Sequence, residues 1–368
     1  MRHEIRSSSS SSTFSSPCRV APAFAAVLGA LTLLFLPLAL SAEEGDQPAA
    51  AKAAAPPAAA ADELPEEPFL KNITQLTFEG DNGEAYWSSD GKQIIFQSKR
   101  GNLEFDQIFM MSADAKMLRM VSTGRGRTTC SYFAPDGKKI IYASTHLREG
   151  PPPKAPAGSP SYDWSFDPAF DIFQADPDGT NLVRLTDAPG YDAEGTYSPS
   201  GKQIIFTSQR DGDLELYVMN ADGSEERRLT NAKGYDGGAF FSPDEKQIVW
   251  RASRTDDYRA LQVFLMNADG TGEIQLTNSG TTSFAPSWHP SGKFIIYSSN
   301  PESPRNFDLF VTDLKGEKVA RITTNPSFDG FPLFSPDGKK LVYCANRDLK
   351  NPRATHVYVA DWSPPAGW

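Results

Sequence analysis

The sequence predicts an all-β fold: a six-bladed β-propeller of four-stranded antiparallel blades. Three observations lead to this prediction. A nine-residue motif occurs six times, each copy lies in a longer segment with four short strand patterns, and the two ends of the repeated region complement each other. Repeats of roughly 45 residues with four strands each are typical of propeller blades.

The repeated motif is a turn followed by a strand. Its copies begin at residues 88, 134, 198, 242, 289 and 335, so they lie 46, 64, 44, 47 and 46 residues apart. The last copy reads SPDGKKLVY (335–343). Proline presets φ, Asp or Ser forms local hydrogen bonds and Gly tolerates a positive φ, which together predict a tight turn. An aromatic residue precedes each turn and an apolar run follows it, as expected for a hairpin.

A second strand pair completes each repeat. The segment DLELYVMNADGSEERRLT (213–230) alternates apolar and polar residues, turns at Ala221-Asp222-Gly223 and ends on Leu229-Thr230. The segment QVFLMNADGTGEIQLT (262–277) has the same scheme. Period-two alternation interrupted by turn residues predicts short strands, so each repeat holds strands a, b, c and d.

The N-terminal strand is predicted to close the ring. The last repeat ends at HVYVADW (356–362) and lacks a Leu-Thr strand of its own, whereas ITQLTF (73–78) precedes the first repeat as an orphan fourth strand. We expect 73–78 to complete the last blade, because closure removes exposed strand edges. The alternative is that 73–78 is a frayed lead-in.

Residues 1–42 are predicted to be a signal peptide. Arg2, Arg6 and Arg19 precede or begin an uncharged stretch at 20–40, and Ala39-Leu40-Ser41 offers small residues for cleavage. This pattern is typical of secretory signals and predicts a periplasmic or secreted protein. The uncharged stretch is also long enough for an uncleaved anchor, which would be the protein's sole contact with a membrane.

The remaining chain divides into a spacer and a propeller. Residues 43–70 are rich in Ala and Pro and predict a disordered spacer, so the propeller is expected at 71–368. Removing 1–42 takes away three Arg and one Glu and changes the net charge from −10 to −12. This acidic balance argues against nucleic acid as a partner. Cys130 and Cys344 fall in different blades, so no disulfide is expected, and we expect a monomer.

The repeats resemble those of the TolB family. The resemblance rests on the SPDGKQIIF-type motif followed by LYVMNADG and RRLT, and it extends over about 290 of the 368 residues. In that family the propeller follows an α/β domain and binds the lipoprotein Pal in the Tol–Pal cell-envelope system. Only the spacer precedes the propeller here, so the resemblance implies a stand-alone TolB-like propeller.

Polar residues recur where the d–a and b–c loops meet one face of the predicted propeller. The functional interpretation is a polar funnel that binds a partner; the alternative is that these residues pair within or between blades. The acidic candidates are Asp192, Glu194, Asp236 and Asp329, with Glu84 at the repeat position of Glu194, and the basic candidates are Arg100, His146, Arg210, Arg254 and Arg347.

An insertion at 146–171 interrupts the second repeat. It lies between strands b and c, so it belongs on the same face, and it is rich in proline. A long loop in a compact fold is usually functional or disordered. Tyr162, Trp164 and Phe166 are therefore candidate partner contacts. The alternative is that the loop packs its aromatic side chains onto its own blade.

The sequence predicts no catalytic residues, no metal site and no cofactor. His3, His146, His289 and His356 lie at unrelated repeat positions, and no Gly-x-Ser-x-Gly segment occurs. The segment DPDG (176–179) fits a c–d turn better than a calcium loop because the expected glutamate is missing. A structural Ca²⁺ on the acidic face stays open.

These observations favour a non-enzymatic binding propeller. We expect a protein or peptide partner in the cell envelope, in a Tol–Pal-like role, with a glycan as a further option. The alternative is a glycan-active enzyme that uses the central funnel, either a hydrolase or an enzyme like the oligogalacturonate lyases, which resemble this repeat and use a His-rich metal site. A third option is an envelope scaffold without a small-ligand pocket.

Overall fold

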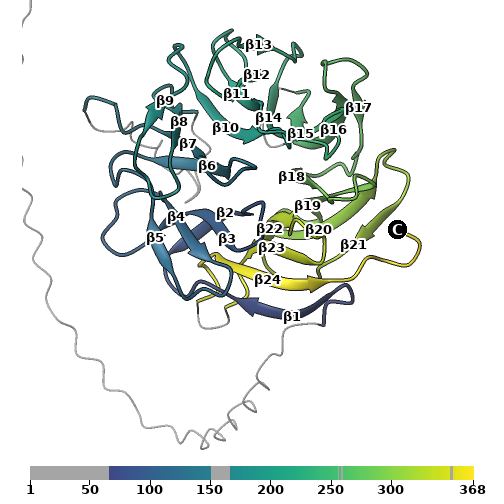
Figure 1. Ribbon diagram of the computed structural model, residues 1–368. Coiled ribbons are helices and arrows are strands. Elements are labelled where there is room, and N and C mark those ends of the chain that lie inside the picture. The colour runs from purple at the N-terminus through teal and green to yellow at the C-terminus, as the bar shows by residue number, and fades with distance from the viewer. Residues whose placement is uncertain (1–65, 151–165, 256, 258–259, 349–350) are drawn as a thin grey trace, which may run out of the picture. The chain divides into compact units, whose positions relative to one another are not determined.

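Six four-stranded antiparallel sheets form a ring in the computed structural model (Figure 1). The structure describes residues 66–150, 166–255, 257, 260–348 and 351–368. The predicted six-bladed propeller is therefore confirmed. In that part of the chain no helix is long and apolar enough to cross a membrane. The predicted signal segment and most of the predicted spacer lie outside the described residues.

The blades follow one another along the chain, each running from its inner to its outer strand. Blade 1 holds β2 (Asp81–Trp87), β3 (Gln93–Lys99), β4 (Gln107–Ser112) and β5 (Leu118–Met120). Blade 2 holds β6 (Thr128–Phe133), β7 (Ile140–Ser144), β8 (Asp171–Ala175) and β9 (Val183–Arg184). Blade 3 holds β10 (Asp192–Tyr197), β11 (Gln203–Ser208), β12 (Glu215–Asn220) and β13 (Arg227–Arg228).

The other three blades repeat this order. Blade 4 holds β14 (Tyr235–Phe241), β15 (Gln247–Ser253), β16 (Gln262–Asn267) and β17 (Ile274–Gln275). Blade 5 holds β18 (Ser283–Trp288), β19 (Phe294–Ser303), β20 (Asn306–Asp313) and β21 (Val319–Arg321). Blade 6 holds β22 (Asp329–Phe334), β23 (Lys340–Ala345), β24 (His356–Trp362) and, as its outer strand, β1 (Leu70–Gln75).

The repeated Ser-Pro-Asp-Gly motif forms the turn between the first two strands. In blade 6 the Ser335 hydroxyl donates to Asp337 at 2.6 Å and accepts the backbone N–H of Lys340 at 2.9 Å. The same two bonds occur at Ser88 in blade 1 and Ser242 in blade 4. Gly338 adopts φ 70°, a conformation that glycine takes at little cost.

The repeated Leu-Thr pair locks the outer strand to the third strand. In every blade a hydroxyl near the end of the repeat accepts a backbone N–H of that third strand, at 2.8–2.9 Å; the donor is the second residue of the strand in five blades and the fourth, Leu309, in blade 5. The acceptors are Ser122, Thr186, Thr230, Thr277, Thr323 and, in blade 6, Thr77. The threonine is repeated because a buried backbone donor needs an acceptor there.

The N-terminal strand closes the ring as predicted. β1 pairs antiparallel with β24, from Leu70 opposite Trp362 to Gln75 opposite Tyr358. The strand begins three residues earlier than the predicted 73–78 segment. Glu67, within the predicted spacer, is buried and accepts hydrogen bonds from Thr324 next to blade 6. The packed fold therefore reaches back at least to Glu67.

The apolar core lies between neighbouring blades. Each of five side-chain clusters draws its residues from two adjacent sheets, such as Ile95 and Tyr142 between blades 1 and 2, or Trp250 and Leu216 between blades 3 and 4. A sixth cluster joins blades 6 and 1 and the residues around the channel. Most apolar side chains are therefore buried between blades. The first strands of the blades, β2, β6, β10, β14, β18 and β22, can then present polar groups at the centre of the ring.

Candidate functional site

Most of the predicted acidic and basic candidates pair with each other inside single blades. Three ion pairs join an aspartate at the start of an inner strand, its first or second residue, to an arginine just beyond the second strand: Asp192–Arg210 at 3.0 Å, Asp236–Arg254 at 2.9 Å and Asp329–Arg347 at 2.6 Å. In blade 1 Arg100 donates to Asn82 at 2.8 Å. The three aspartates are at most 1% exposed. The geometry is that of intramolecular pairs, the alternative left open by the sequence.

Aromatic rings hold the basic members of this set in place. Arg100, Arg210 and Arg254 lie 4.7–4.8 Å from the ring centres of Phe109, Tyr217 and Phe264. His146 takes this position in blade 2, where it packs on Phe173 at 4.4 Å and its Nδ1 lies 2.8 Å from the Ser144 hydroxyl. Burial lowers the His146 pKa. Because the arginine side chains are stacked on rings and already paired, few of their N–H groups remain for hydrogen bonds to a ligand.

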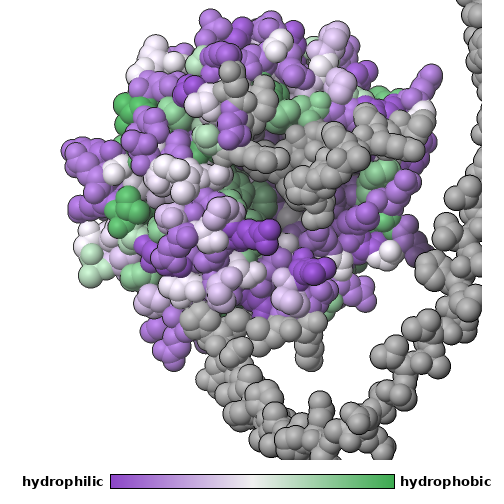
Figure 2. Space-filling model, turned by 180° about the vertical axis from the view of Figure 1, so that it is seen from behind, coloured by the Kyte–Doolittle hydropathy of each residue, from purple (hydrophilic) through white to green (hydrophobic). Residues whose placement is uncertain are grey.

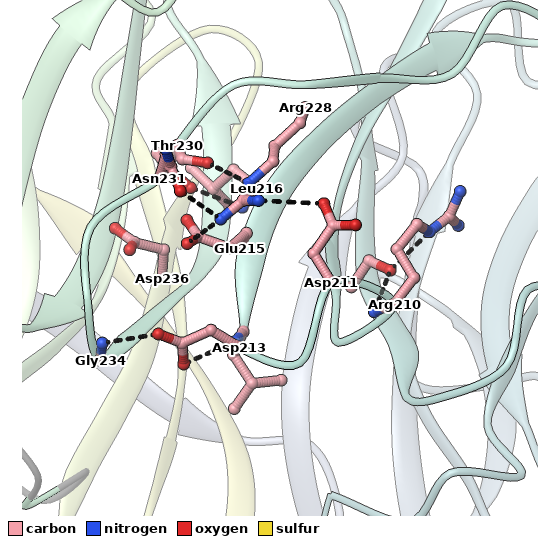
Figure 3. Close-up of polar contacts among 12 residues, drawn as sticks. Arg210, Asp211, Asp213, Glu215, Leu216, Arg228, Thr230, Asn231, Gly234 and Asp236 are labelled. Atoms are coloured by element: carbon pink, nitrogen blue, oxygen red, sulfur yellow. Dashed lines mark hydrogen bonds and ion pairs between the residues drawn. The ribbon is translucent and has the colours of Figure 1, made fainter.

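Blade 3 carries the densest of these polar networks (Figure 3). Arg228 donates to Glu215 at 2.5 Å, to Asp211 at 3.1 Å and to Asn231 at 2.8 Å. Asp213 accepts the N–H of Gly234 at 3.0 Å and so ties the second-to-third strand loop to the next blade. The cluster is acidic, but Arg228 lies inside it, and its role is to fix the loops.

The centre of the ring is built from a different repeat position. Every inner strand has a bulge, and the residue at the bulge has a positive φ of 49–60°. These residues are Glu84, Cys130, Glu194, Gly238, Ala285 and Phe331, and all six line one cavity. Bulges re-aim side chains, and here they point six consecutive blades at a common space.

The cavity is small and has two unlike sides. It has a volume of about 20 Å³, counted as the space open to the centre of a water molecule. Blades 5 and 6 contribute only Ala285, Pro286, Phe331 and Pro332. The polar lining consists of Glu84, Cys130, Ser131, Glu194, Thr196 and Arg251. Rings of Tyr86, Tyr132 and Phe240 meet across the channel with centroids 5.7–5.9 Å apart.

Glu194 is fully engaged by its surroundings. Four donors reach its carboxylate: the Thr207 hydroxyl at 2.8 Å, the Tyr235 hydroxyl at 2.7 Å, the Gly238 N–H at 2.8 Å and Arg251 at 2.5 Å.

Two glycines make room for this cluster. A Cβ on Gly237 would lie 2.3 Å from the Glu194 carboxylate, and a Cβ on Gly238 would lie 2.1 Å from the Arg251 guanidinium. The Gly-Gly pair in the sequence is therefore a packing requirement of the Glu194–Arg251 pair.

Glu84 holds the same position in blade 1 but has few partners. It is 8% exposed, and the hydrogen-bond donor that faces its carboxyl among the described residues is the Cys130 thiol. Burial raises its pKa from 4.5 to about 7, while the nearby charge of Arg251 acts in the opposite direction. Charges on Glu194 and Asp106 add to the increase. The carboxyl of Glu84 is therefore held in its protonated form at a higher pH than an exposed glutamate would be.

The insertion reaches the channel at its described end. Phe166 packs on Tyr191 with centroids 5.4 Å apart and on Tyr235 at 5.8 Å, and both rings belong to the blade 3 and blade 4 side of the channel. Arg148 and Asp167, near the two ends of the insertion, form an ion pair at its base. Tyr162 and Trp164 lie outside the described residues.

Metal-binding geometry is not found in the described part of the chain. No group of three or more His, Cys, Asp or Glu side chains there could hold a metal ion. His146 sits in the stacked position of blade 2, His289 packs on Phe294 beside a turn, and His356 begins β24. The three histidines do not converge.

Sequence reasoning missed Arg251, Cys130 and Ser131 as parts of the site. Arg251 could have been found from the sequence, because it is a charged residue within a mainly apolar second strand, QIVWRAS. Ser131 had a weaker signal: the equivalent residues are Ala85, Gly195, Ala239, Pro286 and Pro332. Of the residues that the sequence singled out on this face, Glu84 and Glu194 line the cavity.

The fold and the channel define a six-bladed propeller with a narrow central cavity that is polar on one side. Residues 164–307 match the family model of the TolB beta propeller domain. The Tol-Pal system protein TolB of Francisella tularensis subsp. mediasiatica (strain FSC147) is 31% identical over 81 residues, which are 22% of this chain and 18% of that protein. The chain thus aligns with less than a fifth of the length of this relative. It is a TolB-like β-propeller repeat protein.

Solved structures agree on the fold. A protein assigned as TolB from Agrobacterium tumefaciens superposes with a TM-score of 0.56 and 22% identity, covering 80% of this chain and 97% of that one. TolB from Acinetobacter baumannii superposes with a TM-score of 0.55 and 20% sequence identity, and the match covers 77% of this chain and 64% of that one. An oligogalacturonate lyase in complex with manganese superposes with a TM-score of 0.50 and 13% sequence identity, and the match covers 82% of this chain and 96% of that one. At these identities the similarity concerns the fold alone.

Proposed function

We propose that this protein is an exported, non-enzymatic propeller that binds a protein or peptide of the cell envelope. Its binding face carries the d–a and b–c loops and the insertion of blade 2. The TolB similarity favours a Tol–Pal-like role, because relatives that share its repeats are Tol-Pal system proteins.

The observation that carries the proposal is the position of the insertion. Its described end places Phe166 on Tyr191 and Tyr235 at the channel, away from the insertion's own blade. The Arg148–Asp167 pair fixes the base of the insertion there. Seen from behind the view of Figure 1, the propeller is hollowed at its centre, with apolar surface at the bottom of the hollow (Figure 2). A hollow with an apolar centre and a polar rim suits a protein partner.

A glycan-active enzyme is the second candidate function. It is favoured by the propeller shared with an oligogalacturonate lyase and by the raised pKa of Glu84. The His146 position weakens it, because a histidine stacked on Phe173 is not aimed at the channel cavity.

The test is a crosslinking pull-down from native cell envelope. The full-length chain is compared with a variant in which residues 151–165 are replaced by a short Gly-Ser linker. This deletion keeps Arg148, Phe166 and Asp167, so the base of the insertion stays closed. We expect a protein partner that is captured by the wild type and lost with the deletion. Equal capture by both forms contradicts the proposed face, and turnover of an acidic oligosaccharide would support the enzyme instead.

A further inference from the structure

Two glutamates at the same repeat position differ in how their charges are balanced. Glu194 faces Arg251 at 2.5 Å and three further donors, so this buried pair is neutral as a unit. Glu84 forms no ion pair within the described residues. When Glu84 is ionised, the cavity therefore carries one uncompensated negative charge, which is costly in a buried place.

Ser131 supplies a second unused polar group. It is 1% exposed and lines the cavity, and its hydroxyl has no hydrogen-bond partner among the described residues. The equivalent residues of the other five blades carry no side-chain hydrogen-bonding group. A buried hydroxyl without a partner costs free energy unless something in the cavity completes it.

The aromatic part of the lining suits a cation, and Arg251, a buried cation in the same lining, is balanced by Glu194. The rings of Tyr86, Phe240 and Phe331 border the same cavity, and aromatic faces attract positive charge. One water-sized group needs roughly 10–15 Å³ by this measure of volume. A cavity of about 20 Å³ therefore has room for one such group.

We propose that the channel cavity is a seat for a single primary ammonium group, held by the Glu84 carboxylate and the Ser131 hydroxyl and bordered by aromatic rings. On the proposed function, on which this assignment of a partner rests, the group is the tip of a lysine side chain or the amino terminus of the bound peptide. The three N–H donors of an ammonium match the acceptors that Glu84 and Ser131 leave open.

Other ligand classes fit the cavity less well. An anion would meet the Glu84 charge, and the Arg251 charge is already taken up by Glu194. A divalent metal would need at least three suitable ligands, which the described residues do not bring together. A quaternary ammonium has no N–H donor and is larger than the seat.

The test uses methylammonium chloride as the probe and tetramethylammonium chloride as its control, at equal ionic strength. Thermal unfolding of the full-length chain is followed at pH 6 and pH 8, since a ligand that binds only the folded state raises the midpoint. We expect methylammonium to raise it and tetramethylammonium to leave it unchanged. With Glu84 titrating at about 7, the apparent affinity should be about tenfold weaker at pH 6 because the ionised fraction is smaller.

Three variants separate the seat from general electrostatics. Glu84→Gln should abolish the methylammonium response, and Ser131→Ala should weaken the apparent affinity roughly three- to tenfold, the value of one hydrogen bond. Asp106→Asn removes a nearby carboxylate that does not line the cavity and should leave the response in place. A response that persists in Glu84→Gln, or that tetramethylammonium reproduces, overturns the seat.

The experiments distinguish a failure of the ammonium seat from a failure of the proposed peptide-binding function. If methylammonium binds but no envelope partner is captured, the seat stands and the peptide-binding function is contradicted. If a partner is captured through the loop face but methylammonium has no effect, the seat is overturned and the binding function stands.

Discussion

At several single positions a non-glycine residue has a positive φ, which strains the backbone but directs the side chain to a particular place. In the channel these conformations aim Glu84 and Glu194 inward at φ 52° and 59°. In the blade turns the same conformation is taken by glycine in five copies and by Glu245, at φ 59°, in blade 4. Glu245 therefore takes a left-handed conformation at a turn position where the other five repeats have glycine.

Glu245 allows the cost of this strain to be measured. Its carboxylate accepts hydrogen bonds from the N–H and hydroxyl of Ser200 in the neighbouring turn, so replacing it loses that contact. Glu245→Gly and Glu245→Ala both lose the contact, but only glycine relieves the backbone. We expect Glu245→Gly to be about 1–2 kcal/mol more stable than Glu245→Ala in urea unfolding. Equal stabilities would mean that the turn relaxes in the alanine variant.

Glu84 should make stability depend on pH. Its folded pKa of about 7 lies above the ordinary 4.5, so the folded state holds the proton more tightly than the unfolded chain. This contribution to stability is fully present below pH 4.5 and is lost as pH rises through 7. The groups that face Glu84, namely Arg251, Cys130, Glu194 and Asp106, stay in place in Glu84→Gln.

Comparing Glu84→Gln with the wild type therefore isolates the effect of protonating the Glu84 carboxyl on stability. We expect the unfolding free energy of Glu84→Gln, relative to wild type, to increase between pH 4.5 and 7 by at most about 1.4 kcal/mol per pH unit, and to level off above. Urea unfolding in steps of half a pH unit measures it. A difference that stays flat across this range would show that Glu84 is solvated in the folded state.

The difference between Glu84 and Glu194 could not be predicted from the sequence. Both lie at the bulge of an inner strand, but three of the four donors to Glu194 lie 41 to 57 residues further along the chain, in blade 4. The pairing of Asp192 with Arg210 was foreseeable as an alternative, because both recur with the repeat. Site residues that break the repeat, such as Ser131, depend on packing between blades.

At the scale of elements, the outer strands are too short to hold by their own ladders. β9, β13 and β17 have two residues each. The threonine that follows such a strand accepts a backbone N–H of the third strand, and this bond extends the pairing by one position. The sequence predicted these strands from Leu-Thr endings, but the reason for the threonine is visible only in three dimensions.

Thr230 tests the role of this hydroxyl. It is 6% exposed and accepts the N–H of Leu216 at 2.8 Å. Thr230→Val keeps the shape and leaves the Leu216 N–H without an acceptor, so we expect a loss of about 1–3 kcal/mol in the free energy of unfolding. Thr230→Ser keeps the hydroxyl and should lose less. If Thr230→Ser loses more stability than Thr230→Val, packing of the threonine methyl rather than the hydrogen bond explains the effect.

At the scale of the whole molecule, the N-terminal strand joins the two ends of the chain. β1 covers the outer edge of β24, Thr77 accepts the Val357 N–H at 2.9 Å, and Glu67 pairs with Arg347 at 2.7 Å. Arg347 is 3% exposed and also pairs with Asp329. Loss of Glu67 would leave this buried arginine with one carboxylate instead of two. The closing segment therefore contributes both a strand and a charge.

Strand complementation gives the most direct test of this closure. A chain that begins at residue 79 lacks β1, exposes the edge of β24 and should unfold at lower temperature with a tendency to associate. Adding a synthetic peptide of residues 66–78 should restore the midpoint in a concentration-dependent manner. A peptide with Thr77→Val should bind at least about tenfold more weakly, because the Val357 N–H stays buried without an acceptor. If the shortened chain is as stable as the full one and ignores the peptide, β1 is a passive cover and the ring is held by the contacts between blades 6 and 1.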